Sequence, residues 1–417
     1  MSSNSAPLPL AHCRFCGAAL ELTFLDLGET PFANSYPRSA LEAERERRYP
    51  LRTRVCTRCM LVQTDYTVNP SELFDEYAYF SSYSSSWLDH ARSYAELAIE
   101  RQHLGPEDLV VEVASNDGYL LRYFQGAGIR VLGIDPAANV AQKAIEEGIP
   151  TVVTYFGTEC ASQLVSDGKR ADLLIANNVL AHVPDLNDFA NGLSILLHPR
   201  GVLSIEVPHV LRLIENVEFD TIYHEHYSYF SLLSAEAILS SHGLHVFDVE
   251  ELPTHGGSLR LWVAHAAAGY DETARKLAVR TKELAAQLDL PQGYEGFSVR
   301  VERCRSSVLD FLARASGDGK QVVAYGAAAK GNTLLNYCGV TSSDIAYAVD
   351  RNPYKIGRLL PGSHLKIHSP EQIALTKPDY LLILPWNLKD EIREQMGYIR
   401  DWGGQIVTPV PEIEFLA

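Results

Sequence analysis

One stretch, residues 109–136, restricts the possible fold of this chain more than any other. An apolar run at 109–113 ends at a small polar turn, and a helix-like segment follows the turn directly. A second apolar run then leads to Asp135. The order strand, turn, helix, strand and acid is typical of an α/β fold that holds an adenine nucleoside, because the acid accepts hydrogen bonds from the ribose hydroxyls. An ordinary βαβ unit with an incidental acid is the alternative interpretation.

The sequence of the turn narrows the choice of ligand. It reads ASNDG at 114–118, so it has only one of the three glycines of the dinucleotide pattern GxGxxG. A pyrophosphate needs the close backbone approach that those glycines allow. S-adenosylmethionine (SAM) has no pyrophosphate, and an acid at the strand end suits a ligand with an amine. The stretch therefore predicts a SAM site, and its binding residues are Glu112, Ala114, Asn116, Gly118 and Asp135.

Composition excludes several classes of protein. A chain of 417 residues can bury more than one core, so two or three domains are expected. The net charge of −16 argues against a nucleic acid partner. No apolar run has transmembrane length, and the first residues lack a signal-peptide pattern. We therefore expect a cytoplasmic protein with no membrane partner.

Four of the seven cysteines form two CxxC pairs near the N-terminus, CRFC and CTRC. A two-residue spacer lets two thiolates turn toward one ion, and two such pairs make a tetrahedral zinc site. Four thiolates leave no open position for a substrate, so the predicted zinc is structural. A redox pair is the less favoured alternative. The predicted ligands are Cys13, Cys16, Cys56 and Cys59.

Alternating strands and helices follow, and they predict a parallel sheet. Asn177, Asn178 and His182 come directly after the fourth expected strand, so they should line the ligand crevice. Five parallel strands with a terminal antiparallel hairpin resemble the class I SAM-dependent methyltransferase fold. The expected strands are 109–113, 130–134, 151–155, 171–176 and 201–207, and the hairpin is 244–251 with 258–264.

The segment FDTIYHEHYSYFS, residues 219–231, concentrates titratable side chains. Such a density is typical of an active site. A histidine can accept a proton near neutral pH, a neighbouring glutamate can orient it, and a tyrosine can donate to a developing oxyanion. Together they could remove a proton α to a ketone. A solvated loop or a structural network is the alternative. A metal site from 224–226 is disfavoured, because adjacent side chains diverge.

The order of motifs carries a more specific resemblance. The CxxC pairs, EVASNDG, IYHEHYSYFS, PTHGGSLR and VVAYGAAAKGNTLLNYCG follow one another as in the nucleotide-sugar C-methyltransferases of antibiotic deoxysugar pathways. The chain resembles these three-domain enzymes over nearly its whole length. The resemblance implies that a base-generated enolate is methylated at C3 of a dTDP-linked 4-keto-deoxysugar. A methyltransferase acting on another small carbonyl or hydroxyl acceptor, or a catalytically silent scaffold, would be the alternatives.

The resemblance also assigns site residues. It implies that His226 is the base and that Tyr223, Glu225 and His182 serve the active site. An upstream active-site tyrosine falls on Tyr77, with Tyr79 as the alternative, in the aromatic and serine-rich stretch 74–87. That stretch is expected to be partly a loop or lid, or else core packing. The sequence departs from its relatives at 114–115, where Gly-Cys can occur, and at His224, where an acid can occur.

The C-terminal part repeats the strand, turn and helix pattern. A helical stretch at 273–315, with an expected break at 288–296, leads through a linker at 316–320 to a strand, a Gly-Ala turn and a helix. A second strand ends at Asp350. A second nucleotide cofactor is disfavoured, because the turn has one glycine and no redox partner is evident. The resemblance assigns this domain to the sugar nucleotide. Candidate diphosphate ligands are Lys330, Arg351, Lys355 and Arg358, each of which could also be an ordinary solvated side chain.

These observations predict an α/β protein of three domains. A zinc module at 1–70 precedes a class I SAM-methyltransferase domain at 71–268, and a second Rossmann-like domain with leading helices occupies 269–417. The expected ligands are SAM, structural zinc and a nucleotide sugar, and the chain is expected to be a monomer or a homodimer.

Overall fold

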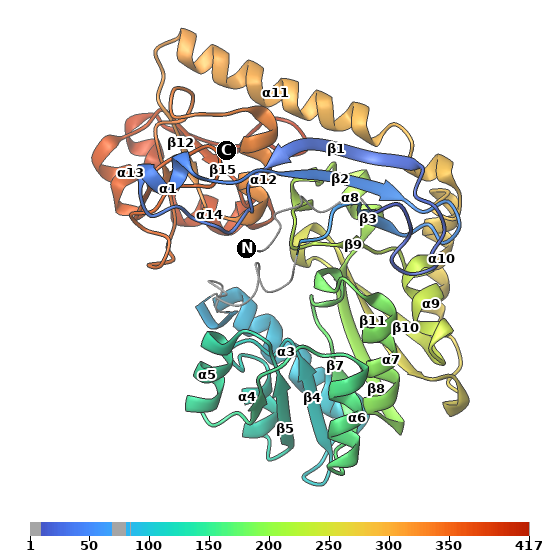
Figure 1. Cartoon of the computed structure of the whole chain (residues 1–417). Coiled ribbons are helices and arrows are strands. Elements are labelled where there is room, and N and C mark those ends of the chain that lie inside the picture. Colours follow the sequence, from blue (N-terminus) through green and yellow to red (C-terminus); the bar gives the residue numbers. More distant parts are fainter. Residues whose placement is uncertain (1–9, 69–80, 84, 417) are drawn as a thin grey trace, which may run out of the picture.

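The computed structural model describes residues 10–68, 81–83 and 85–416, which form three sheets (Figure 1). Tyr77 and Tyr79, which the resemblance assigns to the active site, lie outside the described residues. No helix in the described ranges is long and apolar enough to cross a membrane.

The first sheet is antiparallel and has the order β1-β2-β3-β9. Its first three strands come from the N-terminal part of the chain, and β1 and β2 lie in the interval between the two CxxC pairs. Its fourth strand comes from the segment 219–231, far away in the sequence. The elements are β1 (Leu22–Thr30), α1 (Ala40–Glu44), β2 (Tyr49–Val55), β3 (Val62–Thr64) and β9 (Ser228–Tyr229).

The second sheet has seven strands in the order β10-β11-β8-β7-β4-β5-β6. Strands β4 to β8 are parallel, and β10 and β11 form the antiparallel hairpin, so the predicted arrangement is confirmed. The third strand is shorter than predicted, because Val153 and Tyr155 are exposed beyond this edge of the sheet. The strands are β4 (Leu109–Val113), β5 (Arg130–Ile134), β6 (Thr151–Val152), β7 (Ala171–Ile175), β8 (Leu197–Pro208), β10 (Leu244–Leu252) and β11 (Ser258–His265).

Helices cover both faces of this sheet. Successive residues of β4 belong to different cores, since Val110 packs with Tyr94 and Phe124 while Val111 packs with Leu193. This alternation is expected of a central strand that is buried on both sides. The helices are α3 (Ser85–Gln102), α4 (Leu121–Gly126), α5 (Ala138–Glu146), α6 (Thr158–Ser166), α7 (Leu186–Leu196) and α9 (Leu232–Ser241). A further helix, α8 (Val210–Glu215), follows β8 and packs instead with the N-terminal sheet and the C-terminal unit.

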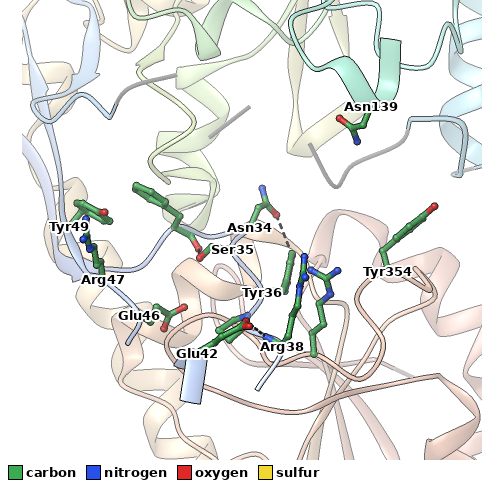
Figure 2. Close-up of a pocket in the computed structure, with 13 residues that line it drawn as sticks. Asn34, Ser35, Tyr36, Arg38, Glu42, Glu46, Arg47, Tyr49, Asn139 and Tyr354 are labelled. Atoms are coloured by element: carbon green, nitrogen blue, oxygen red, sulfur yellow. Dashed lines mark hydrogen bonds between the residues drawn. The ribbon is translucent and has the colours of Figure 1, made fainter. Parts of the chain in front are cut away.

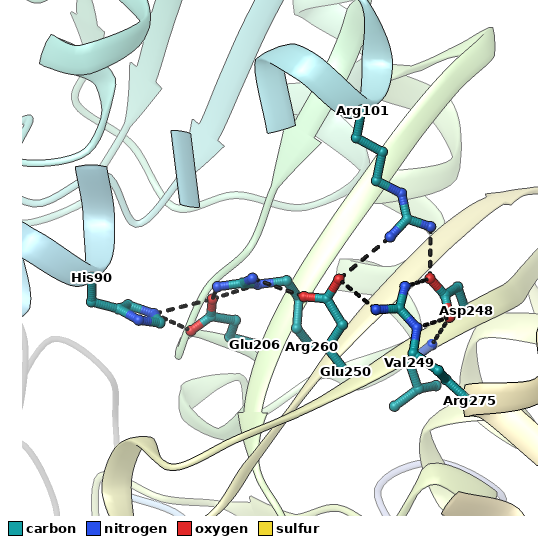
Figure 3. A network of polar contacts seen from close by, with 8 residues as sticks. All are labelled: His90, Arg101, Glu206, Asp248, Val249, Glu250, Arg260 and Arg275. Carbon is teal, nitrogen blue, oxygen red and sulfur yellow. Dashed lines mark hydrogen bonds and ion pairs between the residues drawn. The ribbon is translucent and has the colours of Figure 1, made fainter. Parts of the chain in front are cut away.

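A network of charged side chains joins α3 to the hairpin (Figure 3). Glu206 of β8 contacts both the imidazole of His90 at 3.1 Å and the guanidinium of Arg260. Burial by itself would raise the pKa of Glu206, but the hydrogen bond from His90 and the charge of Arg260 outweigh it and lower the pKa. Asp248, which is fully buried, accepts from Arg101 and Arg275 in the same network. His90 and Arg101 therefore hold α3 against β8 and β10.

The third sheet has the order β14-β13-β12-β15-β16-β17 and is parallel except for β17. This confirms a second Rossmann-like unit. The second predicted strand, which leads to Asp350, is present as β13, whereas β14 and β17 have only two and three residues and are too short to be recognised from the sequence. The strands are β12 (Val322–Tyr325), β13 (Ala348–Val349), β14 (Ile367–His368), β15 (Tyr380–Ile383), β16 (Gln405–Thr408) and β17 (Glu414–Leu416), and the helices are α12 (Ala329–Cys338), α13 (Glu371–Thr376) and α14 (Lys389–Gln395).

Two helices connect the second sheet to the third, α10 (Ala274–Ala285) and α11 (Phe297–Gly317), and the predicted break between them is present. The linker is shorter than predicted, because α11 continues to Gly317. In Figure 1 α11 runs along the ribbon of β1 and β2, and the rings of Phe24 and Phe297 stack at 4.6 Å between centroids. The N-terminal sheet and the C-terminal unit therefore share one apolar core.

Candidate active site

The carboxyl ends of β4, β5 and β7 form the crevice in which the SAM residues were predicted. Between β4 and α4, residues 114, 116 and 118 have positive φ angles of 58°, 50° and 74°. Gly118 adopts this conformation freely, and Asn116 tolerates it, whereas Ala114 is strained there. The turn thus has the tight backbone that a glycine-rich loop would form. Non-glycine residues held in this conformation are typical of ligand-binding sites.

Asp135 lies directly beside this turn. Its Oδ2 accepts from the backbone N–H of Asn116 at 2.9 Å, and its Oδ1 accepts from that of Ala137 at 2.9 Å. Each carboxylate oxygen has a further lone pair, so both can still accept from a ribose hydroxyl. Burial raises the pKa of Asp135 to about 6, although the two backbone hydrogen bonds lower it in part.

The crevice contains buried polar atoms that lack partners among the described residues. These include Oε2 of Glu112, Oδ1 of Asn177 and both amide atoms of Asn178. Burial raises the pKa of Glu112 well above its usual value, and the charges of Asp135 and Asp117 raise it further. Buried polar groups without partners are costly unless a ligand satisfies them. The donors and acceptors present therefore fit the amino acid and adenosine parts of SAM.

His226 and Tyr223 form a hydrogen-bonded pair in the segment between η3 (Phe219–Thr221) and β9. The Tyr223 hydroxyl lies 2.7 Å from Nε2 of His226, and Nδ1 of His226 lies 3.0 Å from the carbonyl oxygen of Thr221. A carbonyl oxygen only accepts, so Nδ1 carries the proton of the neutral ring. Nε2 is then the basic nitrogen, and it accepts from Tyr223. The arrangement defines which atom can take a proton.

His182 reaches the same place from η2 (Leu180–His182), directly after β7. The rings of His182 and His226 meet edge to face at 4.7 Å between centroids. Burial lowers the pKa of His226 well below its usual value, and the nearby His182 lowers it further. Burial also lowers the pKa of His182 to about 4. Both imidazoles are therefore neutral at neutral pH, and the structure brings together the two histidines that the sequence singled out.

The neighbours of His226 point elsewhere. His224 is buried, its Nε2 lies 3.2 Å from the carbonyl oxygen of Pro50, and burial lowers its pKa to about 4. Glu225 accepts from the side-chain amide of Asn34 at 2.7 Å. Burial raises the pKa of Glu225 to about 7, while Asn34 and the charge of Lys355 lower it in part. Tyr223 and His226 are half-buried, so they are the members of this segment that can meet a substrate.

Lys330, the second residue of α12, is half-buried near the acids Asp220 and Glu218. Its Nζ donates to Oδ1 of Asn387 at 2.9 Å and lies 4.5 Å from the ring centre of Trp386. The indole of Trp386 donates to Asp220 at 2.7 Å. Burial lowers the pKa of Lys330, while Asp220 and Glu218 oppose the shift. The expected position at a helix start is present.

The other candidate cations of the C-terminal unit separate into two groups. Lys355 donates to the carbonyl oxygen of Ala327 at 2.7 Å and lies over the ring of Tyr36. Arg358 lines a cavity of about 680 Å³ near it. Arg351, in contrast, is exposed and lies 3.9 Å from Glu391, away from that cavity. The structure thus groups Lys355 and Arg358 but not Arg351.

The cavity lies between three parts of the chain (Figure 2). The figure shows Tyr36 and Arg38 of the N-terminal part beside Tyr354, with Asn139 of α5 across from them. The guanidinium groups of Arg38, Arg47 and Arg358 have no ion-pair partner among the described residues. The lining residues are Phe32, Asn34, Ser35, Tyr36, Pro37, Arg38, Glu42, Glu46, Arg47, Tyr49, Asn139, Tyr354 and Arg358.

Sequence reasoning missed several residues of this region. Asn34 and Tyr36 lie in an N-terminal loop. The Tyr36 hydroxyl donates to the side-chain oxygen of Asn34 at 3.2 Å, and the side-chain nitrogen of Asn34 donates to Glu225. Asp220 and Trp386 pair across 166 residues of chain. The polar run Asn34-Ser35-Tyr36 after an apolar strand was the one available signal for the loop. No local pattern could have linked Asp220 to Trp386.

The four predicted zinc ligands meet at one point. Their sulfur atoms lie within 4.8 Å of one another, and they are the one metal-ligating group found in the described part of the chain. The Cys13–Cys59 and Cys16–Cys56 sulfur pairs are separated by 3.6 Å and 3.4 Å. Thiolates about 2.3 Å from a tetrahedral zinc ion lie about 3.8 Å apart, so the donor set fits zinc.

Comparisons with known proteins agree with this geometry. Family models match as "Putative zinc binding domain" at 13–74, "Methyltransferase domain" at 87–249 and "C-methyltransferase C-terminal domain" at 253–411. The C-methyltransferase NovU of Streptomyces niveus is 37% identical over 97% of this chain and 96% of its own. A ubiquinone biosynthesis O-methyltransferase of Methylobacterium sp. (strain 4-46) is 29% identical over 30% of this chain and 60% of its own.

A solved structure of magnesium protoporphyrin IX methyltransferase from Synechocystis PCC 6803 with bound SAM is also similar. It is 17% identical, covers 43% of this chain and 79% of its own, and superposes with a TM-score of 0.33.

Fold and site together define a SAM-dependent methyltransferase with a structural zinc site. The chain belongs to the C-methyltransferase family that includes NovU, with which it aligns almost from end to end. It is therefore a SAM-dependent C-methyltransferase.

Proposed function

We propose that the chain methylates C3 of a dTDP-linked 4-keto-deoxysugar through an enolate. The observation that carries the proposal is the Tyr223–His226 pair, in which a neutral imidazole and a phenol share one hydrogen bond of 2.7 Å. A carbon acid next to a ketone needs a base for its proton and a donor for its oxygen. The pair supplies both, and the resemblance to nucleotide-sugar C-methyltransferases supports the choice of substrate.

The proposed base is Nε2 of His226. The C3–H bond breaks, its proton moves to Nε2, and its electrons form the enolate of the C4 ketone. Burial disfavours the imidazolium that results, but the negative enolate created in the same step offsets this cost. The hydrogen bond from Nδ1 to Thr221 keeps Nε2 free of its own proton beforehand.

The proposed oxyanion donor is Tyr223, with Tyr77 as the alternative that the resemblance implies. In the structure the Tyr223 hydroxyl donates to Nε2. A ketone oxygen placed beside the Tyr223 hydroxyl would accept this hydrogen bond in place of Nε2. The lone pair of Nε2 would then be free to take the C3 proton. When bound in the crevice, SAM supplies an electrophilic methyl group. His182 and Glu225 are proposed to hold the segment and the substrate in place.

The cavity of Figure 2 is proposed to take the sugar nucleotide. Arg38, Arg47 and Arg358 bring three positive charges without ion-pair partners, and Glu42 and Glu46 bring two negative ones. Glu46 is occupied by His364 at 3.0 Å and by a backbone N–H. In a chain of net charge −16, such a cationic pocket favours a diphosphate. The aromatic residues of the cavity can pack against the nucleobase of the sugar nucleotide.

The base assignment is tested with His226→Asn and the matched control His224→Asn. We expect His226→Asn to bind ligands normally and to lose turnover by about 10²- to 10⁴-fold, the usual contribution of a positioned base. It should also lose exchange of the substrate C3 hydrogen with deuterated water. His224→Asn should keep both. Wild-type exchange in His226→Asn, measured by mass spectrometry, would exclude His226 as the base.

The substrate assignment is tested with Arg358→Ala and Arg351→Ala. We expect Arg358→Ala to raise the KM for the dTDP-sugar, and to weaken dTDP binding, by about tenfold or more, since a charge-assisted hydrogen bond contributes about 1.5–3 kcal/mol. The exposed Arg351 should change neither by more than about twofold. Equal effects of the two substitutions in calorimetry would contradict the assignment of the cavity.

A further inference from the structure

The N-terminal sheet includes part of the proposed catalytic segment. Strand β9 pairs with β3, with Tyr229 opposite Val62 and Ser228 opposite Gln63. The pairing continues past the strand end, because the N–H of Thr64 donates to the carbonyl oxygen of Tyr227 at 3.0 Å. His226 directly precedes this paired stretch. His226 is therefore next to a chain segment that pairs with β3, and β3 follows the zinc ligand Cys59 closely in the sequence.

Gln63 ties that sheet to the first cysteine pair. Its side-chain oxygen accepts from the backbone N–H of Arg14 at 2.9 Å, and its amide nitrogen donates to the sulfur of Cys13 at 3.1 Å. Gln63 is fully buried. A donor to a metal-bound thiolate is a common way to orient a ligand. These two hydrogen bonds from one side chain fix the backbone of Arg14 beside the zinc ligand Cys13.

The side chain of Arg14 reaches from the zinc site toward the histidines. Its Nη2 donates to the carbonyl oxygen of Thr64 at 2.9 Å, and its Nη1 lies 3.5 Å from that of Pro184. Its guanidinium lies over the ring of Tyr227, 5.0 Å from the centroid. Pro184 and Tyr227 belong to the two chain segments that carry His182 and His226. Arg14 therefore contacts both segments at once.

Tyr227 is held at each of its other polar groups as well. Its hydroxyl donates to the carbonyl oxygen of Val68 at 3.0 Å, and its N–H donates to that of Ala181 at 2.7 Å. Ala181 directly precedes His182, so this last hydrogen bond couples the two histidine segments. These hydrogen bonds hold Tyr227 in position, and the guanidinium of Arg14 stacks on its ring.

We propose that Arg14 is a positioning residue, which uses the rigidity of the zinc site to hold His182 and His226 in reacting geometry. The inference rests on the proposed role of His226. Arg14 is not among the residues that line the cavity of Figure 2. Its planar guanidinium combines a stacking face with paired donors, which a lysine cannot reproduce. The zinc site would thus serve the chemistry through one side chain as well as through folding.

The test compares Arg14→Ala with Arg58→Ala. Arg58 lies between the other two zinc ligands, Cys56 and Cys59, and is exposed, so it is a matched control. We expect Arg14→Ala to keep one zinc ion per chain and to lose kcat by about 10- to 100-fold, the effect of a misplacement of about 1 Å. The KM for SAM should stay the same. Amide hydrogen exchange of residues 222–229 should accelerate in Arg14→Ala alone.

The outcomes separate this inference from the proposed function. If zinc-loaded Arg14→Ala keeps the wild-type kcat and the wild-type rate of amide hydrogen exchange, the inference is overturned. It is also overturned if amide exchange accelerates without a loss of kcat while His226→Asn is inactive. If His226→Asn is active too, the proposed function fails instead. Should Arg14→Ala not retain zinc, Arg14→Lys replaces it in the same measurements. It keeps the charge over Tyr227 but not the planar donors, so kcat should still fall.

Discussion

At the scale of single residues, burial more than ion pairing determines the protonation states of this site. It lowers the pKa values of His182 and His224 to about 4 and raises those of Glu225 and Glu218 to about 7. The site therefore holds neutral histidines at neutral pH, and its acids titrate near that pH. Charge at this site then depends on what binds there, because a ligand that excludes water strengthens every electrostatic interaction.

Asp135 leads to a prediction about pH. Its pKa is about 6, and only the carboxylate can accept from both ribose hydroxyls. As the pH falls below about 6, the protonated form accumulates, so the affinity for S-adenosylhomocysteine should fall by up to tenfold per pH unit. The ligand itself does not titrate between pH 5 and 8. Calorimetric titrations across that range measure the effect.

Asp135→Asn provides the control for this pH dependence. The substituted enzyme should bind S-adenosylhomocysteine weakly and with little change between pH 5 and 8. It should also lose about 1–3 kcal/mol of stability, because one of the backbone N–H donors of Asn116 and Ala137 loses its acceptor. A pH dependence that persists in Asp135→Asn would belong to another group, and Glu112 would be the first candidate.

At the scale of elements, the turn after β4 shows how one backbone shape can be reached by different residues. Three alternating positions have positive φ, yet only one of them is glycine. Asn116 also uses its side chain, whose oxygen accepts from the N–H of Ser81 at 3.0 Å. This contact couples the turn to η1 (Ser81–Tyr83), just before α3. Ala114 makes no comparable use of its methyl group and only incurs strain.

Ala114→Gly should therefore stabilise the protein. We expect a gain of about 0.5–1 kcal/mol, because glycine adopts the φ of 58° without a steric cost. Binding of S-adenosylhomocysteine should be kept. Ala278→Gly, at an exposed helical position of α10, should instead lose about 0.5–1 kcal/mol. Denaturant unfolding measures both, and a loss of stability in both variants would show that residue 114 is not strained.

At the scale of the whole molecule, the zinc module and the SAM crevice belong to different sheets but converge on one segment. The crevice residues are carried by β4, β5 and β7, whereas β9 adds the segment of His226 to the N-terminal sheet. Loss of zinc should then affect chemistry more than cofactor binding. The chain's division into domains at residues 70 and 268 stays a prediction, and β9 shows that the sheets do not follow it.

Cys59→Ser tests this separation. Binding of structural zinc contributes on the order of 10 kcal/mol to the folding of small zinc modules, so the N-terminal sheet should lose order without it. We expect little zinc, a lower melting temperature and lost methyl transfer, with an affinity for S-adenosylhomocysteine close to that of the wild type. Cys160→Ser, outside the cluster, should match the wild type throughout. Loss of S-adenosylhomocysteine binding in Cys59→Ser would show that the crevice depends on the module.

The sequence by itself determined whatever depends on neighbouring residues. The strand, turn and acid around Asp135 and the spacing of the CxxC pairs are local patterns, because the backbone geometry that they need spans only a few residues. The five parallel strands and the hairpin followed from alternation along the chain. The density of titratable groups at 219–231 identified a segment but not the direction of its side chains.

Only the tertiary structure decided which distant groups meet. The hydrogen bond between Asn34 and Glu225 spans 191 residues, and the cavity of Figure 2 is lined from three separate parts of the chain. Strand β9 has two residues, too few for any periodicity, and it is defined by its partner β3. Contacts of this kind depend on how whole sheets pack, and packing is a property of all the buried surfaces together rather than of any local pattern.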